Sequence, residues 1–247
     1  MKKVSILLST ILLIACLASA QTAAPTTFSV HEDIVKPSMD AKFRETMKKL
    51  KAACELHKTS FGWSTIAYDD NSYRHLAPLK SFSELEKNPF AELETKMGKE
   101  ALGKIWADFD ECIESHSDFV AMLMPNLSYL SPAAGENYRD IMYWYALPGK
   151  EAEAEATMVE WKKLYESKKA PNGFLIYKVM FGRESGGYAV VSWGKDRADA
   201  DTKSQKTDEL IGVEAGKLWA KTLTLTKKYN NKRGSVLPEF SYNGVYK

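Results

Sequence analysis

The histidines are the first candidates for chemistry, because histidine is the side chain whose ordinary pKa lies closest to neutral pH. The chain has four of them. His75 stands in YRHLAPL (73–79), a predicted strand, where it could act as a general base. His31 stands in FSVHEDIV (28–35), which is also typical of a strand. His75, His31 and the adjacent Arg74 are therefore the catalytic candidates. A structural role within a strand is the alternative for both histidines.

The other two histidines, His57 and His116, are predicted at the ends of helices. A basic side chain near a helix C-terminus suits the helix dipole, which accounts for His57 without a catalytic role. His116 aligns with Tyr229 in an internal repeat described below, since 229 − 116 = 113. Because an aromatic residue stands in its place there, we interpret His116 as a spacer and not as a ligand.

Aromatic side chains are dense in the predicted strands, and MYWYALPG (142–149) is the densest stretch. Successive side chains of a strand point to opposite faces, so one face can form an aromatic wall suited to an apolar or flat ligand. Core packing is the alternative explanation. The ligand-binding candidates are Trp63, Tyr68, Tyr143, Tyr145, Tyr177 and Trp193.

Composition and motifs exclude several classes of protein. A formal net charge of +2 over 247 residues lacks the concentrated Lys/Arg face that nucleic acids require, so no nucleic-acid partner is expected. The sequence has no glycine-rich phosphate loop, G-x-S-x-G, HExxH or CxxC motif. Its cysteines and histidines have no metal-type spacing, so no metal site is predicted.

Residues 1–20 have the pattern of an export signal of bacterial type. A lysine pair precedes an apolar run that is shorter than the ~20 residues needed to span a membrane. Cleavage after Ala20 would release a periplasmic or secreted protein without a transmembrane segment. In the alternative, LIAC is a lipobox that ends at Cys16, and a lipid on Cys16 anchors the protein to a membrane.

Two cysteines remain after this segment, Cys54 and Cys112. An oxidising compartment would allow a disulfide between two neighbouring helices. Cys112 also lies on the apolar stripe of a predicted helix, and Leu225 occupies its place in the repeat. The alternatives are therefore a Cys54–Cys112 bridge and small buried hydrophobic residues.

The chain repeats itself at long range. GKIWA begins at Gly103 and GKLWA at Gly216, an offset of 216 − 103 = 113. MPNLSY (124–129) and LPEFSY (237–242) have the same offset, since 237 − 124 = 113. A period this long indicates duplicated domains, which we place at 26–130 and 138–247.

Each unit has the predicted order strand, helix, strand–strand hairpin, helix, strand. This is the split βαβ, or ferredoxin-like, pattern. Helices cover one face of such a sheet, and the other face needs a partner to avoid a large exposed apolar patch. The predicted fold class is α+β, with two tandem ferredoxin-like (βαββαβ) repeats whose sheets pack on each other. The resemblance described next implies that they form an intramolecular pseudo-dimeric α+β barrel.

This element order and duplication resemble the dimeric α+β barrel superfamily, which includes antibiotic-biosynthesis monooxygenases and NIPSNAP-like, chlorite-dismutase-like and stress-responsive barrel proteins. The resemblance implies ligand sites between each sheet and its helices, or inside the barrel. It also allows haem, although no cofactor is predicted from the residues themselves.

The functional expectation is an exported protein that binds a small apolar or aromatic molecule. One alternative is an enzyme, either a cofactor-independent monooxygenase or a haem-dependent relative. The other is a structural or interaction module of the cell envelope, which would have a filled interior.

Overall fold

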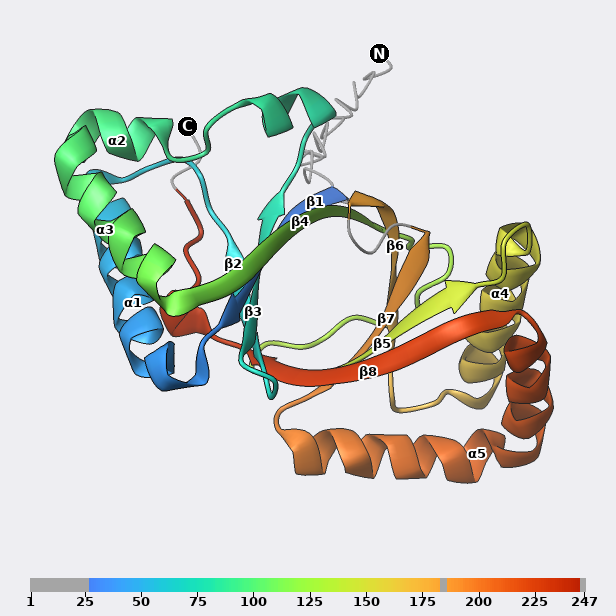
Figure 1. Cartoon of the computed structure of the whole chain (residues 1–247). Helices are drawn as coiled ribbons and strands as arrows, with labels where there is room; N and C mark the ends of the chain where they lie inside the picture. Colours follow the sequence, from blue (N-terminus) through green and yellow to red (C-terminus); the bar gives the residue numbers. More distant parts are fainter. Residues whose placement is uncertain (1–26, 183–185, 245–247) are drawn as a thin grey trace, which may run out of the picture.

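The structure is a computed structural model that describes residues 27–182 and 186–244. Eight antiparallel strands close into one barrel in the order β1-β3-β2-β8-β5-β7-β6-β4. The helices lie outside the barrel in two groups, each covering one part of its wall (Figure 1). This arrangement confirms the predicted α+β class.

The first half of the barrel begins with a strand and a helix, as the sequence predicts. The helix buries Phe43, Met47, Leu50 and Cys54, which recur at helical spacing along one face. The elements of this half are β1 (Thr27–Val35), α1 (Asp40–His57), β2 (Ser64–Tyr68), β3 (Ser72–Pro78), α2 (Ala91–Met97), α3 (Lys99–Cys112) and β4 (Ile113–Leu123), with short 3-10 turns η1 (Pro37–Met39) and η2 (Phe82–Glu86).

The second half has the same succession of strands. Its elements are β5 (Tyr138–Ala146), α4 (Glu151–Lys168), β6 (Leu175–Gly182), β7 (Gly187–Gly194), α5 (Arg197–Thr224), β8 (Thr226–Val236) and the turn η3 (Pro238–Phe240). Within the closed barrel, β4-β1-β3-β2 of the first half matches β8-β5-β7-β6 of the second. The two half-sheets join edge to edge, where β2 pairs with β8 and β4 pairs with β6.

The last strand of the first half follows its helix without a loop. α3 ends at Cys112, and β4 begins with the next residue, Ile113. β4 pairs with β1 along almost its whole length, and this long-range pairing outweighs the local helical pattern. As a result His116 lies within a strand and not at a helix end, which corrects the sequence interpretation.

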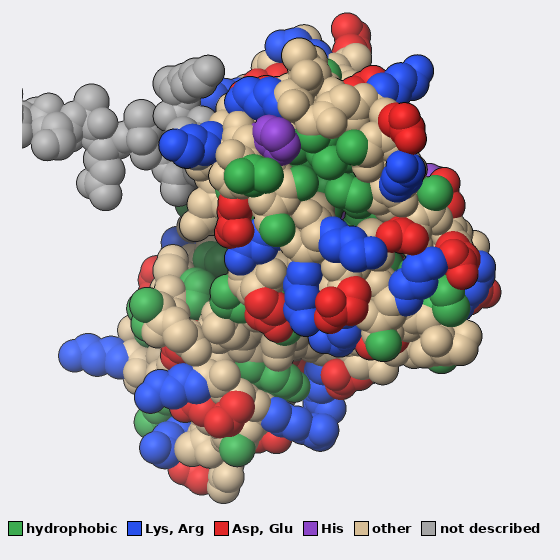
Figure 2. Space-filling view, turned by 90° about the vertical axis from the view of Figure 1, so that its left-hand side faces the viewer, with side chains coloured by type: hydrophobic (Ala, Val, Ile, Leu, Met, Phe, Trp, Pro, Cys, Tyr) green, Lys and Arg blue, Asp and Glu red, His purple; other side chains and the backbone are tan. Residues whose placement is uncertain are grey.

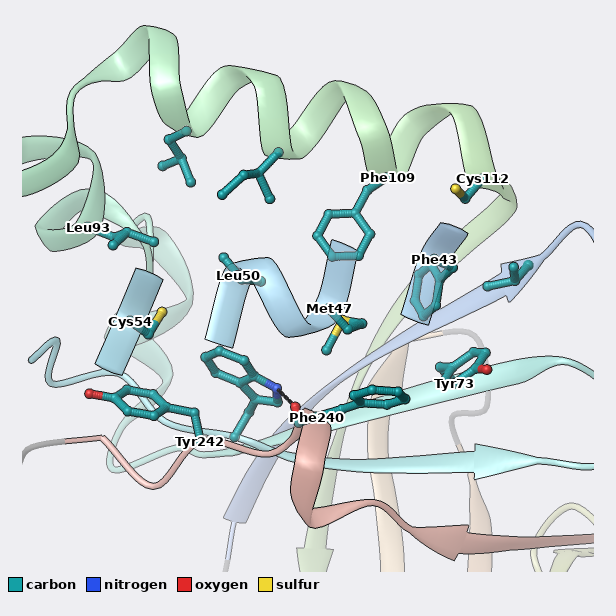
Figure 3. Packing of buried hydrophobic residues seen from close by; sticks show 14 of the residues in the cluster. Phe43, Met47, Leu50, Cys54, Tyr73, Leu93, Phe109, Cys112, Phe240 and Tyr242 are labelled. Atoms are coloured by element: carbon teal, nitrogen blue, oxygen red, sulfur yellow. Dashed lines mark hydrogen bonds between the residues drawn. The ribbon is translucent and has the colours of Figure 1, made fainter. Parts of the chain in front are cut away.

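The repeated motifs after these strands cross to the opposite half. Tyr242, near the C-terminus, forms a β-bridge with Trp63 of the first half, and Phe240 lies in the core beneath α1 (Figure 3). In the same way Tyr129 of the first half forms a bridge with Phe174 of the second. The two crossing segments tie the halves together. We call the C-terminal one, residues 238–242, the crossing arm.

The solvent face of α1 and α3 carries both signs of charge interspersed (Figure 2). Lys49 pairs with Asp108 at 3.1 Å, and Lys42 contacts both Asp108 and Glu111. Exposed pairs of this kind contribute little stability, so the buried inner faces of these helices hold them on the sheet.

Candidate functional site

Five titratable side chains gather on the helix-facing side of the first half-sheet. His31 on β1 lies opposite His75 on β3 and opposite Asp118 on β4. Asp33, two residues further along β1, lies opposite His116. Residues directly opposite in antiparallel strands share a face with Cβ atoms about 5 Å apart. The sheet therefore brings together residues that are up to 87 positions apart in the sequence.

These residues line one end of a cavity of about 400 Å³ between the half-sheet and helices α1 and α3. Side chains of both helices point into the space above the sheet, as Figure 3 shows for Met47 and Phe109. We call this cavity the histidine pocket. Most of its remaining wall is apolar, and five aromatic residues contribute to it: Phe61, Trp63, Phe90, Trp106 and Phe109.

His31 is a fixed cation in this pocket. Its Nδ1 lies 2.8 Å from Asp118 and its Nε2 3.0 Å from Asp33. Partial burial disfavours the charged ring, but the hydrogen bonds to Asp118 and Asp33 outweigh it and raise the pKa of His31 to about 10. A ring that holds its proton at neutral pH is not a general base.

Asp33 is the corresponding fixed anion. Its side chain is buried, which alone would raise its pKa, but the hydrogen bond from His31 and the nearby ring of His75 lower the pKa below its ordinary value. Asp118 is more exposed, and its hydrogen bond with His31 lowers its pKa as well. The polar end of the pocket therefore holds two carboxylates around one imidazolium.

His75 has a different arrangement. Its Nδ1 lies 3.0 Å from Thr65 Oγ1, whose only proton is donated to the carbonyl oxygen of Phe240. Thr65 must then accept from His75, so Nδ1 carries a proton. When the ring is neutral, Nε2 has no proton and carries a lone pair that can accept one. Nε2 is 3.3 Å from Asp33 but not aligned for a hydrogen bond, and it is buried without any other partner among the described residues.

His116 is one of the pocket residues that sequence reasoning missed, together with Asp33 and Asp118. Its ring is exposed and stands edge-on to His31, with centroids 5.5 Å apart. His31, Asp33 and His116 offer three ligand atoms within 4.8 Å of one another, a spacing that a metal ion can bridge. Both ring nitrogens of His31 already have carboxylate partners, however. ESHSD (114–118) has no apolar residue, so the alternation that marks a strand is absent from the sequence here.

Arg74 lies on the opposite face of the sheet from His75, because neighbouring residues of a strand alternate. Its side chain is buried inside the barrel, where Nε and Nη2 donate to Glu32 at 2.8 Å and Nη1 donates to the hydroxyl of Tyr143. The structure thus separates the three catalytic candidates: His31 and His75 share the histidine pocket, and Arg74 does not.

Most of the predicted ligand-binding aromatics also face the barrel interior. Tyr68, Tyr143, Tyr177 and Trp193 line a cavity of about 340 Å³ there, which we call the barrel cavity. Tyr145 packs in the same interior cluster. Trp63 lies against the helices and borders both cavities.

The second half has a smaller cavity, about 230 Å³, between its sheet and helices α4 and α5. β1 and β5 are equivalent strands, and each has a register shift just before its last residue. Counting back four positions from that last residue, Met142 of β5 occupies the place of His31 of β1. Met142 pairs with Val190 where His31 pairs with His75. The corresponding cavity is therefore apolar, and the ionisable chemistry belongs to the first half.

The predicted Cys54–Cys112 disulfide is wrong for this structure, because both cysteines are buried and free. Cys112 ends α3 near the start of α1, beside Phe43 in Figure 3, whereas Cys54 lies near the end of α1. Eleven residues of helix rise about 16 Å, far beyond the ~7 Å that a disulfide spans. Each thiol is a small buried hydrophobic group.

The predicted export signal at 1–20, with Ala20 and Cys16, lies outside the described residues. Among the residues described, no helix has the length and apolar character needed to cross a membrane.

No protein-family model matches the chain, and no curated protein matches it in sequence. Its similarity to solved structures extends over most of its length. An anthrone oxidase-like protein gives a TM-score of 0.59 at 13% identity, covering 91% of this chain and 96% of that one. The fold is that of the dimeric α+β barrels.

Two further structures agree. A candidate monooxygenase from Lactobacillus acidophilus gives a TM-score of 0.53 at 6% identity, covering 87% of this chain and 97% of that one. Chlorite dismutase from Candidatus Nitrospira defluvii gives 0.52 at 9% identity, covering 87% and 92%. At such identities the similarity concerns the fold and not the activity.

Haem, which the resemblance allows, does not fit the residues present. The histidine pocket has no Lys or Arg among its lining residues to bind the two carboxylates of a haem, and it presents Asp33, Asp110 and Asp118 instead. The barrel cavity has arginines but no histidine. Among the described residues, none of the three cavities combines an axial imidazole with a lysine or arginine for a propionate.

Proposed function

We propose that this protein binds a flat, neutral, largely apolar aromatic molecule in the histidine pocket, and that it does so outside the cytoplasm after export. The observation that carries the proposal is the five-ring aromatic wall around about 400 Å³, with a polar end formed by histidines and aspartates. A purely structural module would have a filled interior, so the cavities support binding. The leader pattern at 1–20, with Cys16 as the alternative anchor, supports export.

The charge of the pocket sets the charge of the ligand. Asp33, Asp110 and Asp118 line it, and no lysine or arginine does. His31 offsets one of these charges, so the pocket stays net negative. An anion entering it would lose its hydration without gaining a counter-charge. A neutral aromatic molecule has no such penalty.

The two halves resemble each other in strand order, in the crossing segments and in the 113-residue offset of their motifs. We include in the proposal that they arose as tandem ferredoxin-like repeats. Only the first would then have kept or gained the ionisable pocket.

Two fluorescent probes of matched shape test the binding proposal: neutral N-phenyl-1-naphthylamine and its anionic relative 8-anilinonaphthalene-1-sulfonate. Trp63 and Trp106 line the pocket, so a bound neutral probe should quench their emission by energy transfer. Ala77→Phe fills this pocket from β3, and we expect it to weaken binding of the neutral probe at least about tenfold, or ~1.4 kcal/mol.

Val190→Phe is the matched control, because it fills the corresponding cavity of the second half. It should leave the affinity for the neutral probe unchanged. Both variants are checked for folding by circular dichroism. If Ala77→Phe has no effect while Val190→Phe abolishes binding, or if the anionic probe competes equally for the same site, the proposal is refuted.

A second candidate function is proton abstraction from the bound molecule, favoured by the unpartnered Nε2 of His75. Anthrone is a suitable probe: it is flat and neutral, and its methylene C–H is acidic. In D₂O the protein should accelerate exchange of that methylene, followed by NMR. His75→Gln should abolish the acceleration and His57→Gln should not. If the native protein gives no acceleration, catalysis is rejected while binding stands.

A further inference from the structure

The barrel cavity is chemically unlike the histidine pocket. All eight strands contribute side chains to it, and nearly all of these are aliphatic or aromatic. Its volume of about 340 Å³ is in the range of small-molecule sites. Two cations, Arg74 and Arg139, are the charged residues that line it. Their pairing therefore decides what the cavity can bind.

Arg74 is neutralised within the protein. It lies 2.8 Å from Glu32, and both side chains are almost fully buried. The rings of Tyr68, Phe119 and Tyr143 surround its guanidinium at 4.5 to 5.4 Å. Its charge and its donors are occupied, so it has little left to offer a ligand.

Arg139 has no such partner. Its Nη1 donates to the backbone oxygens of Glu136 and Tyr138 at 2.6 and 2.9 Å. The Glu136 carboxylate pairs with Lys203 instead. Within 27–182 and 186–244, no carboxylate forms an ion pair with Arg139, and its Nε and Nη2 have no hydrogen-bond acceptor. A half-buried cation without a counter-charge is unfavourable unless something else supplies one.

Two tyrosine hydroxyls complete the polar part of the cavity. Tyr68 and Tyr177 both line it, and neither hydroxyl has a hydrogen-bond partner among the described residues. Burial raises the pKa of Tyr68 to about 12 and raises that of Tyr177. Both hydroxyls therefore keep their protons and remain donors.

We propose that the barrel cavity is a second ligand site, which binds a single-chain carboxylate with its carboxylate on Arg139 and its hydrocarbon chain inside the barrel. A planar guanidinium matches a carboxylate with two parallel hydrogen bonds. One unpaired cation suits a monoanion better than a phosphate dianion. The site prefers an anion, whereas the histidine pocket excludes one, so the two proposals stand or fall separately.

Decanoate and decanol test this site, because they differ mainly in the charge of the head group. Calorimetry with the purified full chain should show decanoate binding at least tenfold more tightly than decanol. Arg139→Gln should reduce the affinity for decanoate at least tenfold and leave that for decanol unchanged, and Arg139→Lys should retain part of the preference. Removing an unpaired charge should also leave the melting temperature of the ligand-free protein unchanged or higher, which separates loss of the site from loss of the fold.

Two blocking variants locate the binding. Ala189→Leu, which fills the barrel cavity, should weaken both probes, and Ala77→Phe in the histidine pocket should weaken neither. Equal affinity of the native protein for decanoate and decanol would overturn the proposal. So would a decanoate affinity that Arg139→Gln does not change, or one that only Ala77→Phe reduces.

Discussion

Gly62→Ala should both destabilise the protein and disturb the histidine pocket, because the end of the crossing arm packs directly against Gly62. A Cβ at this position would lie 2.7 Å from the backbone of Tyr242 and Asn243. Ordinary contacts begin at 3.4 Å, so the arm must move by about 3.4 − 2.7 = 0.7 Å. It is held there by two backbone hydrogen bonds between Trp63 and Tyr242, at 2.7 and 2.9 Å.

The cost follows from this forced movement. Overpacking of a rigid site destabilises by about 1–3 kcal/mol. For a chain of this size each kcal/mol lowers the melting temperature by about 2–4 °C, so we expect a decrease of about 2–12 °C. The Phe240 carbonyl accepts from both Trp63 Nε1 and Thr65 Oγ1. A displaced arm should therefore also weaken binding of the neutral naphthylamine probe.

Thermal unfolding followed by circular dichroism, with Gly103→Ala as the control, measures the effect. Gly103 lies within α3 with open space around it, so an added methyl group should stabilise the helix by about 0.5–1 kcal/mol. If Gly62→Ala melts at or above the temperature of Gly103→Ala, the crossing arm does not dock as described. If Gly62→Ala is clearly destabilised but binds the probe with unchanged affinity, the crossing arm does not control the shape of the histidine pocket.

Three further predictions follow from buried or paired groups. Arg74→Met should lower the free energy of unfolding by about 3 kcal/mol, measured by urea unfolding, because it breaks a buried ion pair with Glu32. We expect the low end of the range for such pairs because Lys232 still lies 3.1 Å from Glu32. A loss below about 1 kcal/mol would contradict the pairing. Asp118→Asn should lower the pKa of His31 from about 10, measured by NMR titration of the imidazole C–H signals. Because the pKa of His31 is raised in the folded state, its ion pair with Asp118 stabilises the protein fully below pH 6.5, and this stabilisation is lost as the pH rises through about 10. The difference in stability between the native protein and Asp118→Asn should therefore shrink between these two pH values. A thiol reagent should label neither Cys54 nor Cys112 in the native protein and both of them after unfolding without reductant, whereas a disulfide would block labelling until reduction.

Local patterns determined much of the architecture. The spacing of Phe43, Met47 and Leu50 fixed the inner face of α1, because a helix repeats every 3.6 residues whatever its surroundings. The 113-residue offset and the order of elements indicated two similar halves around a shared interior, and the closed barrel agrees with this expectation. His31 and His75 could be proposed as candidates from residue type and strand context alone.

What only the tertiary structure decided is which residues meet. His116 joins His31 because β4 pairs with β1 in one register, and a sequence contains no record of which strand will be its neighbour. Arg74 and His75 are adjacent in sequence but serve different cavities, because the pleat of a strand sends them to opposite faces of a sheet whose two sides are both buried. The acidic histidine pocket and the cationic barrel cavity are separate because the sheet closes into a barrel. Closure gives every strand one face toward the interior and one face toward the exterior.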